Sequence, residues 1–481
     1  MEDIEGYEPH ITQELIDRGH ARRMGHLENY FAVLSRQKMY SNFTVYAELN
    51  KGVNKRQLML VLKLLLQKYS TLAHTIIPKH YPHHEAYYSS EEYLSKPFPQ
   101  HDFIKVISHL EFDDLIMNNQ PEYREVMEKI SEQFKKDDFK VTNSGSEFFF
   151  KDLALLFCKI EEKGFDYDEE FIEDQVIIDY DRDYTEISKL PKPITDRIDY
   201  KPALTSLPKF FLTTFIYEHC NFKTSSESTL TARYSPSTNA NASYNYLLHF
   251  STKEVEQIRA QIKKNVHDGC TLTPFIQACF LVALYRLDKL FTKSLLEYGF
   301  DVAIPSNARR FLPNDEELRD SYKYGSNVGG SHYAYLISSF DIPEGDNDKF
   351  WSLVEYYYDR FLESYDNGDH LIGLGVLQLD FIVQNKNIDS LLANSYLHQQ
   401  RGGAIISNTG LVSQDTTKPY YVRDLIFSQS AGALNFSNVC HLNGWLKNMD
   451  MSVVQGTLRD RGEWESFCKL FYQTISEFAS L

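Results

Sequence analysis

Several histidines could remove a proton from a substrate, and none is marked by a motif of its own. His219 stands in "YEHCNFKTSS", four residues before Lys223. A neutral imidazole accepts a proton near physiological pH, which suits it to general base catalysis. A hydrogen-bonded packing role is the better interpretation of His219. His267 in "NVHDG" is expected to cap or flank a helix, and His332 in "GGSHY" could line a ligand channel.

The sequence indicates neither a metal site nor a dinucleotide site. "HYPHHE" brings His80, His83 and His84 together, but no second cluster of ligands completes a metal centre, which favours solvated loop histidines. "GLGVLQ" at 373–378 has two glycines of a dinucleotide fingerprint and lacks the third. We therefore expect no bound metal or cofactor.

The composition is that of an acidic globular protein with large apolar interiors or apolar ligands. The chain has 481 residues, of which 42% are hydrophobic and 14% aromatic. Lys plus Arg is 50 and Asp plus Glu is 67, a net charge of −17. Such a surface repels nucleic acid, so we expect no nucleic-acid partner. An anionic co-substrate would need a locally basic cleft.

Cysteine use and hydropathy favour an intracellular protein. The six cysteines are scattered with no Cys-x-x-Cys pair, which fits a reducing compartment. The start, "MEDIEGYEPHITQ", has no apolar core and is not a signal peptide. The longest apolar run, "LMLVLKLLL", is too short to span a bilayer.

The first half begins with a strand, a helix and a second strand. Apolar residues alternate in "SNFTVYAELN", as in a half-buried strand. "NKRQLMLVLKLLLQKYS" predicts a helix and "LAHTII" a short strand. "EFFFKDLALLFCKIEEKG" predicts a further helix, and an acidic, proline-containing connector follows it.

The second half restarts this pattern. "YNYLLHF" alternates as a strand, and Ser251 with Glu254 has the spacing of a capping box that opens a helix. Thr273 and Pro274 are the expected N-cap and first residue of the next helix. The last segment predicts an amphipathic helix with one apolar stripe: Trp464, Phe467, Phe471, Ile475 and Phe478.

These elements predict an α/β fold of the α+β type, with two lobes of similar build in tandem. We expect an N-terminal lobe at 1–185, a crossover connector at 186–245 and a C-terminal lobe at 246–481. Ligand channels commonly lie between domains, which places the expected channel between the lobes.

Six blocks in a fixed order resemble the fungal alcohol acetyltransferase family of the coenzyme A-dependent acyltransferase superfamily. They are "RGHARRMGHLENYFAVLSRQKMY", "LPKPITDRIDYKPALTSLP", "TLTPFIQACF", "IPSNARRFLP", "YGSNVGGSHY" and "IISNTG". The resemblance runs from about residue 18 to the C-terminus. Its N-terminal block and the order of the blocks are its most specific parts.

The resemblance implies two chloramphenicol-acetyltransferase-like lobes with a tunnel between them, in a monomer. Acetyl-CoA is the implied co-substrate, and an alcohol or an amine enters from the other side. A histidine removes the acceptor's proton while the acceptor attacks the thioester carbonyl. In the family's His-x-x-x-Asp-Gly motif, the aspartate braces the loop by pairing with an arginine.

The position of this motif is unusual in the present chain. In the family the motif ends a core strand, and a Ser-Gly pair and a helix follow it directly. "NSGSEFFFKDLALL" resembles that later segment, so Asn143, Ser144 and Gly145 correspond to channel or acyl-CoA-binding positions.

The motif should therefore lie in "DDFKVT", where its residue types are missing. The histidine position reads Asp137, the aspartate position Val141 and the glycine position Thr142. The aromatic, basic strand that should precede the motif is absent as well. A carboxylate such as Asp137, with an ordinary pKa of about 4, is a weak base towards an alcohol.

Three explanations remain open. The strand and motif are truly deleted, a gene-model or splicing error removed them, or another histidine serves, with His219 and His332 as the alternatives. Lys223 cannot take the place of the motif's acid, because a lysine repels the arginine with which that acid pairs.

Four further positions follow from the resemblance. Arg309, or its neighbour Arg310, would pair with the motif's acid or bind donor phosphates, unless both are surface arginines. Asn327 would lie in a turn near the channel. Ser407 and Asn408 would face the tunnel or stabilise an oxyanion, with simple turn formation as the alternative.

The leading functional hypothesis is an alcohol O-acetyltransferase that forms an acetate ester from acetyl-CoA. The alternatives are a catalytically dead homologue that binds acyl-CoA or alcohol, and an N-acetyltransferase acting on a long-chain amine. The resemblance also suggests peripheral attachment to endoplasmic reticulum or lipid droplets through amphipathic terminal helices.

Overall fold

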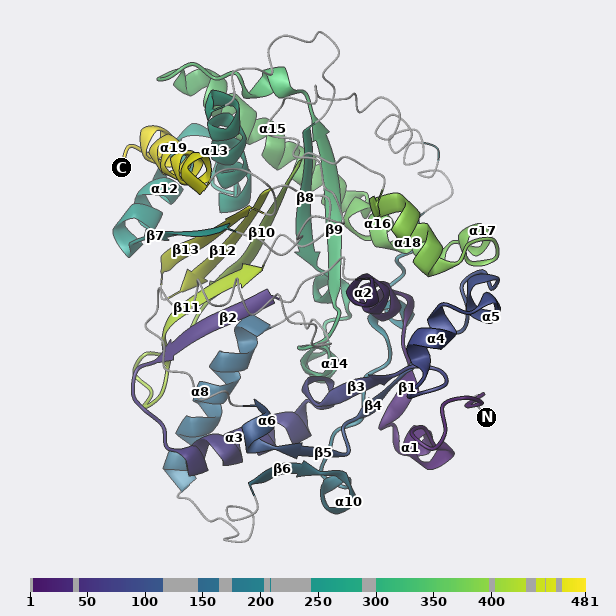
Figure 1. Ribbon diagram of the computed structural model, residues 1–481. Helices are drawn as coiled ribbons and strands as arrows, with labels where there is room; N and C mark the ends of the chain where they lie inside the picture. Colours follow the sequence, from purple (N-terminus) through teal and green to yellow (C-terminus); the bar gives the residue numbers. More distant parts are fainter. Residues whose placement is uncertain are drawn as a thin grey trace.

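The computed structural model describes residues 3–37, 43–115, 146–163, 175–202, 208, 244–287, 300–397, 403–429, 438–445, 447–455 and 461–481. Within these residues the chain forms one large and three small β-sheets with helices around them (Figure 1). Mixed helix and sheet in two halves agrees with the predicted fold class.

The largest sheet belongs to the second half of the chain. Its order is β7 (Tyr244–Phe250), β13 (Asn448–Gln455), β12 (Asn438–Trp445), β10 (Gly403–Val412), β8 (Phe300–Asn307) and β9 (Val328–Tyr335). Strand β10 pairs in parallel with β8 and β12, and the other pairs are antiparallel. This sheet is the frame of the C-terminal lobe.

Four helices cover this sheet: α12 (Thr252–Asn265), α13 (Leu272–Leu287), α15 (Asn347–Asp366) and α19 (Arg461–Ala479) (Figure 1). Helix α13 is buried along most of its length, from Pro274 to Tyr285. The predicted stripe of α19, from Trp464 to Phe478, is at most 1% exposed and packs into the same core. Burial of each such side chain contributes about 1.5–3 kcal/mol.

The first half forms smaller sheets. One has the order β1 (Ala21–Arg23), β4 (Phe103–Val106) and β3 (His74–Ile77), and another pairs β5 (His109–Glu111) with β6 (Val176–Asp179). Helix α3 (Lys55–Lys68) begins with a capping box between Asn54 and Gln57, and it packs on α8 (Ser146–Lys163). The predicted strand, helix, strand start is confirmed.

Strand β2 (Phe43–Leu49) pairs only with β11 (Val422–Gln429) among the described strands. The pairing is antiparallel and runs from Phe43 opposite Gln429 to Leu49 opposite Val422. Strand β11 also lies beside β12 and β13 of the large sheet. A strand from the second half therefore joins the two lobes.

The remaining helices are shorter, and two of them, α2 and α18, pack on each other across the two halves of the chain. They are α1 (Gln13–Arg18), α2 (His26–Arg36), α4 (His84–Tyr88), α5 (Glu91–Leu94), α6 (Phe112–Leu115), α10 (Tyr180–Asp183), α14 (Glu316–Ser321), α16 (Asp369–Gly375), α17 (Asp380–Val383) and α18 (Ile388–Leu397).

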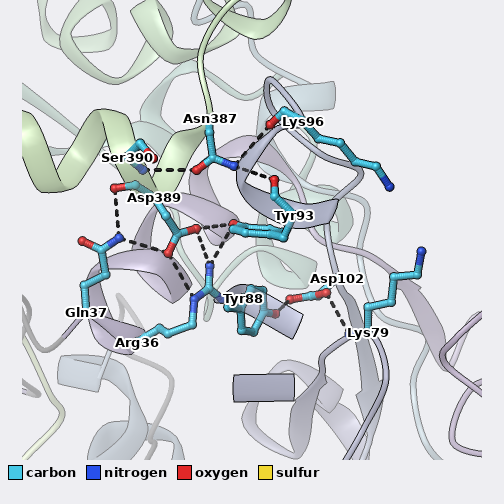
Figure 2. A network of polar contacts seen from close by, with 10 residues as sticks. All are labelled: Arg36, Gln37, Lys79, Tyr88, Tyr93, Lys96, Asp102, Asn387, Asp389 and Ser390. Atoms are coloured by element: carbon cyan, nitrogen blue, oxygen red, sulfur yellow. Dashed lines mark hydrogen bonds and ion pairs between the residues drawn. The ribbon is translucent and has the colours of Figure 1, made fainter. Parts of the chain in front are cut away.

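A polar network fastens α2 to α18 (Figure 2). Arg36 makes a two-point ion pair with Asp389, with N···O distances of 2.8 and 3.3 Å, and its guanidinium lies 3.5 Å from the ring centre of Tyr88. Gln37 and Tyr93 donate further hydrogen bonds to the Asp389 carboxylate. The network forms a second link between the two halves of the chain.

The segment "RGHARRMGHLENYFAVLSRQKMY" packs against the proline-containing connector that follows residue 185. Arg22 pairs bidentately with Glu28 at 2.7 and 2.8 Å, and its Nε donates to the Pro191 carbonyl at 2.5 Å. A Cβ atom on Gly25 would lie 2.4 Å from the Pro193 Cβ. The block is thus a docking surface for the proline-rich connector. The domain boundaries at 185 and 245 stay predictions.

Across the described residues, no helix has both the length and the apolar character needed to cross a bilayer. The apolar stripe of α19 faces the core of the C-terminal lobe.

Candidate functional site

A basic pocket with a volume of about 380 Å³ opens on the C-terminal lobe. Helix α12, the loop that precedes α13, and the ends of β10, β12 and β13 surround it. Arg259, Lys263 and Lys447 line it together with one acid, Asp268. In a chain of net charge −17, the excess of cations over acids in its lining makes this pocket locally basic.

The sequence of α12 explains how the pocket obtains its cations. Val255, Ile258 and Ile262 are buried and fix the inner face of the helix. Arg259 and Lys263 therefore project from the exposed face, one helical turn apart. The ion pair between Lys263 and Asp268 spans 3.6 Å and is largely exposed, so it holds Lys263 only weakly.

A hydrogen bond fixes the pocket-lining Asn448 to the start of α12. Thr252 at the start of α12 donates to the Asn448 side chain at 2.7 Å. Lys447, in the turn between β12 and β13, has a φ of 78°, which is the left-handed conformation of tight hairpin turns. Burial raises the pKa of Cys270, which also lines the pocket, to about 11, so its thiol remains protonated at neutral pH.

Asn408, one of the predicted channel residues, lines this pocket. Its Nδ2 donates to the Thr273 hydroxyl at 3.0 Å, and its Oδ1 accepts from the Gly410 amide at 2.8 Å. Gly410 has a φ of 82°, so the asparagine also closes a turn. Ser407 is half-buried beside it on β10 and does not line the pocket.

A second cluster lies between the lobes, where α8 begins. We call it the interlobe seam, made of Tyr69, Phe148, Asp152, Arg309, Lys323 and Tyr324. The Arg309 guanidinium lies 5.2 Å from the ring centre of Phe148, three residues after Gly145. Its Nε donates to the Asn307 side chain at 2.8 Å, and it also donates to the Lys323 carbonyl. Arg309 thus lies against the first turn of α8, while Arg310 is exposed.

Asp152 is the buried acid of the seam and was not identified from the sequence. It is 8% exposed and accepts hydrogen bonds from the Lys323 ammonium at 2.6 Å and the Tyr324 hydroxyl at 2.7 Å. Tyr69 packs edge-on against Tyr324, with 4.9 Å between ring centres. The available signal was an acid directly before the apolar stretch "LALLF" of a predicted helix, which indicates a buried polar contact.

Asn327 is buried, and its side-chain amide makes hydrogen bonds within its own loop. It donates to the carbonyls of Tyr322 and Tyr324 at 2.6 and 3.1 Å. The preceding Gly325 has a φ of 119°. Asn327 therefore shapes the loop that carries Lys323 and Tyr324 into the seam.

Neither His332 nor His267 belongs to the pocket lining or to the seam, although His267 directly precedes the pocket-lining Asp268. His332 is exposed on the edge strand β9, with its ring beside Gly373 of α16. His267 accepts a hydrogen bond from the Gly269 amide at 3.0 Å and touches the Tyr358 ring, as expected of a residue flanking a helix. Outside the described residues lie Asp137, Val141, Thr142, Asn143, Ser144, Gly145 and His219.

Gly375, the second glycine of "GLGVLQ", is needed for close packing. A Cβ atom on Gly375 would lie 1.6 Å from the Tyr200 carbonyl oxygen, so the connector passes directly over α16. Where the structure describes the chain, no group of three or more His, Cys, Asp or Glu side chains has the arrangement of a metal site.

The fold is shared with solved acyltransferases and condensation domains. The trichothecene 15-O-acetyltransferase TRI3 from Fusarium sporotrichioides matches with a TM-score of 0.62 at 13% identity, over 95% of each chain. The first condensation domain of the calcium-dependent antibiotic synthetase matches with a TM-score of 0.58 at 11% identity, over 95% of this chain and 96% of that one. The chain therefore shares the fold of these acetyltransferase and condensation domains.

Sequence comparison gives the family. The alcohol acetyltransferase family profile matches residues 23–148 and 143–475. Alcohol O-acetyltransferase 2 of Saccharomyces cerevisiae is 87% identical over the full length of both chains, and alcohol O-acetyltransferase 1 of the same organism is 32% identical over 95% of each. The chain belongs to the alcohol acetyltransferase family, so it is an acyltransferase with acetyl-CoA as co-substrate.

The family profile match is divided into two parts, and the alignment with alcohol O-acetyltransferase 2 contains gaps. The family match breaks into two parts that meet at 143–148. The alignment with alcohol O-acetyltransferase 2 is 55 positions longer than this chain, 536 against 481. The two parts of the family match overlap at the start of α8, just after the positions 137–142 where the motif is expected.

Proposed function

We propose that this protein has the architecture of an alcohol O-acetyltransferase, which transfers acetyl from acetyl-CoA to an alcohol hydroxyl. The observation that carries the proposal is the full-length identity of 87% with alcohol O-acetyltransferase 2. The basic pocket supports it, because coenzyme A is an anion with several phosphate groups.

In this proposal the pocket holds the phosphates of acetyl-CoA. Arg259 and Lys263 supply cations from α12, and Lys447 supplies a third from the opposite side. Charge-assisted hydrogen bonds of this kind contribute about 1.5–3 kcal/mol each when they form. The thioester arm then extends past Asn408 on β10 towards the interlobe seam.

The reaction requires a base, and neither the described lining of the pocket nor the seam contains a histidine. The alcohol oxygen attacks the thioester carbonyl as its proton moves to the base, the carbon–sulfur bond breaks, and coenzyme A leaves as the thiol. A positioned base contributes about 10²–10⁴-fold to such a step. We propose that the base belongs to a His-x-x-x-Asp-Gly segment before Asn143, and that Arg309 would hold its aspartate.

Medium-chain or branched alcohols are the proposed acceptors, and a long-chain amine is the alternative. A monomer and a location on endoplasmic reticulum or lipid droplets are also proposals, and they rest on the resemblance alone.

The test uses the purified 481-residue chain, acetyl-CoA and an isoamyl-type alcohol. We expect saturable acetyl-CoA binding by calorimetry, weakened about tenfold or more in the Arg259→Ala, Lys263→Ala double variant, because charge-assisted hydrogen bonds are lost. Lys264→Ala is the matched control, since Lys264 is an exposed cation on the same helix outside the pocket. Unchanged binding in the double variant would remove the assignment of the pocket.

Free thiol and ester are then measured with the same chain. We expect turnover about 100-fold or more below that of an otherwise matched chain with the segment restored, because the base is missing. Retained acetyl-CoA binding with no turnover even after restoration would instead favour a binding protein.

A further inference from the structure

A buried acid and an exposed histidine face each other across β7 and β13. Asp450 lies directly opposite His249 in the strand register, and the Asp450 Oδ1 is 2.8 Å from the His249 Nδ1. The Asp450 side chain is 4% exposed, whereas that of His249 is 57% exposed. The pair therefore joins a carboxyl group inside the protein to an imidazole that can exchange protons with water.

The second carboxyl oxygen of Asp450, Oδ2, makes no hydrogen bond where the structure describes the chain. Asn443 lies directly opposite Asp450 on β12. Its amide already donates to the Leu425 carbonyl at 2.5 Å and accepts from the Phe427 amide at 3.2 Å. A buried carboxylate with an unpaired oxygen is destabilising, and a protonated carboxyl is less so. Loss of the proton therefore favours a movement that brings water to Oδ2.

The charges around the pair also favour a bound proton. Burial raises the pKa of Asp450 to about 6, and Asp424 of β11 adds to this rise, whereas His249 opposes it. The other charged groups that act on this cluster are Glu254 at the start of α12, Arg423 of β11 and Glu48 of β2. Arg423 is paired with Glu48, so acids remain in excess around the imidazole.

The pair lies next to the wall of the basic pocket. Asn448 and Met449, the two residues before Asp450 on β13, line the pocket. Thr252, three residues after His249, donates to the Asn448 side chain at 2.7 Å. Helix α12, which carries two of the pocket cations, begins at the same threonine. The contact between the pair and this hydrogen bond are successive links between the same two segments, so loosening of one weakens the other.

We propose that His249 and Asp450 form a proton-dependent latch: a proton on the pair holds the start of α12 against β13, and its loss loosens the pocket wall and weakens anion binding. The identity of that anion as acetyl-CoA rests on the proposed function, whereas the latch is a feature of the strands themselves. Because the folded-state pKa of Asp450 exceeds its ordinary value of 3.8, the latch is held below pH 3.8 and is released as the pH rises through about 6.

The first test measures hydrogen exchange of the unliganded 481-residue chain between pH 4 and pH 7, corrected for the intrinsic exchange rate. With rising pH, the amides of His249–Thr252 and Asn448–Asp450 should open about threefold or more relative to those of Asp450→Asn, which has no carboxyl proton to lose. His249→Ala should move the transition to higher pH, because the contact with His249 lowers the pKa of Asp450. Glu256→Gln is the matched control, since Glu256 is an exposed acid of α12 outside the pocket.

The second test measures acetyl-CoA affinity by calorimetry over the same pH range. The phosphates of the ligand titrate equally with every variant, so the ratio of the dissociation constants of the wild type and Asp450→Asn isolates the contribution of the protein. This ratio should rise about threefold or more as the pH passes about 6. The corresponding ratio for Glu256→Gln should not change.

An exchange profile that Asp450→Asn leaves unchanged, or opening that spares Asn448 and Met449, would overturn the latch. A His249→Ala profile without the upward shift would do the same. Opening accompanied by a constant ratio of dissociation constants would overturn the link to anion binding. Failure of acetyl-CoA to bind at any pH would instead contradict the proposed function, and exchange at Asn448 and Met449 would then decide the latch by itself.

Discussion

At the residue scale, Asp450 is a buried acid whose charge is only partly compensated. It is 3% exposed, and its Oδ1 lies 2.8 Å from the His249 Nδ1. Its Oδ2 has no hydrogen-bond partner. Burial raises the pKa of Asp450 to about 6, although the contact with His249 works in the opposite direction. The Asp450 carboxyl therefore binds its proton more tightly in the folded protein than in the unfolded chain.

This shift predicts a pH dependence of stability. Because the folded-state pKa exceeds the ordinary value of 3.8, the favourable contribution is present below pH 3.8 and is lost as the pH rises through about 6. A shift of about two units corresponds to at most about 3 kcal/mol. The free energy of unfolding of the protein, measured against Asp450→Asn in urea, should fall relative to the variant between pH 4 and pH 7. A difference that is constant with pH would contradict the assignment.

Removal of the Asp152 carboxylate is predicted to lower the stability of the protein, because Asp152 is the buried acid of the interlobe seam. Asp152→Ala removes the acceptor for Lys323 and Tyr324 and leaves a partly buried ammonium without its carboxylate. We expect a loss of about 1–3 kcal/mol, because Lys323 keeps some access to water. Urea unfolding checks this, with Lys159→Ala on the exposed side of α8 as the control. Equal stability of the two variants would show that the seam contributes nothing.

At the element scale, local patterns predicted helices better than they predicted contacts. The capping box at Ser251, the helix from Ser146 and the stripe of α19 are local signals, and the structure has all three. Helix α13 begins at Leu272 rather than after Thr273, so the predicted cap is wrong. The Thr273 hydroxyl instead accepts the hydrogen bond from Asn408.

Contacts between distant segments were beyond the reach of sequence periodicity. The pairing of β2 with β11 and the ion pair between Asp152 and Lys323 join segments far apart in the chain. Alternation shows that a strand exists and which face is apolar, but not which strand lies beside it. The basic pocket likewise combines α12 with the turn before β13, and only the fold brings these together.

The close packing of Gly375 in α16 against Tyr200 of the connector predicts that a larger residue at 375 destabilises the protein. Gly375→Ala would place a Cβ atom 1.6 Å from the Tyr200 carbonyl oxygen, and a backbone atom cannot rotate away. We expect a loss of about 1–3 kcal/mol or more from overpacking, seen as a lower melting temperature. Gly52→Ala is the control, because nothing lies within 4 Å of its added Cβ. A normal melting temperature for Gly375→Ala would mean that the connector does not rest on α16.

At the scale of the whole molecule, the two lobes are joined by the β2–β11 pair, the interlobe seam and the Arg36–Asp389 network of Figure 2. The basic pocket lies on one lobe and the seam between both. In the proposed mechanism, acetyl transfer requires a base on a segment before Asn143. The sequence lacks the expected motif there, and the family match divides at 143–148.

The most direct measurement compares the initial rate of acetate ester formation by the 481-residue chain with that of a chain in which the additional segment of alcohol O-acetyltransferase 2 is inserted before Asn143. Both chains should bind acetyl-CoA. The restored chain should form ester about 100-fold faster or more, since it regains a positioned base. Equal rates in the two chains would contradict the account and show that the base lies elsewhere in this protein.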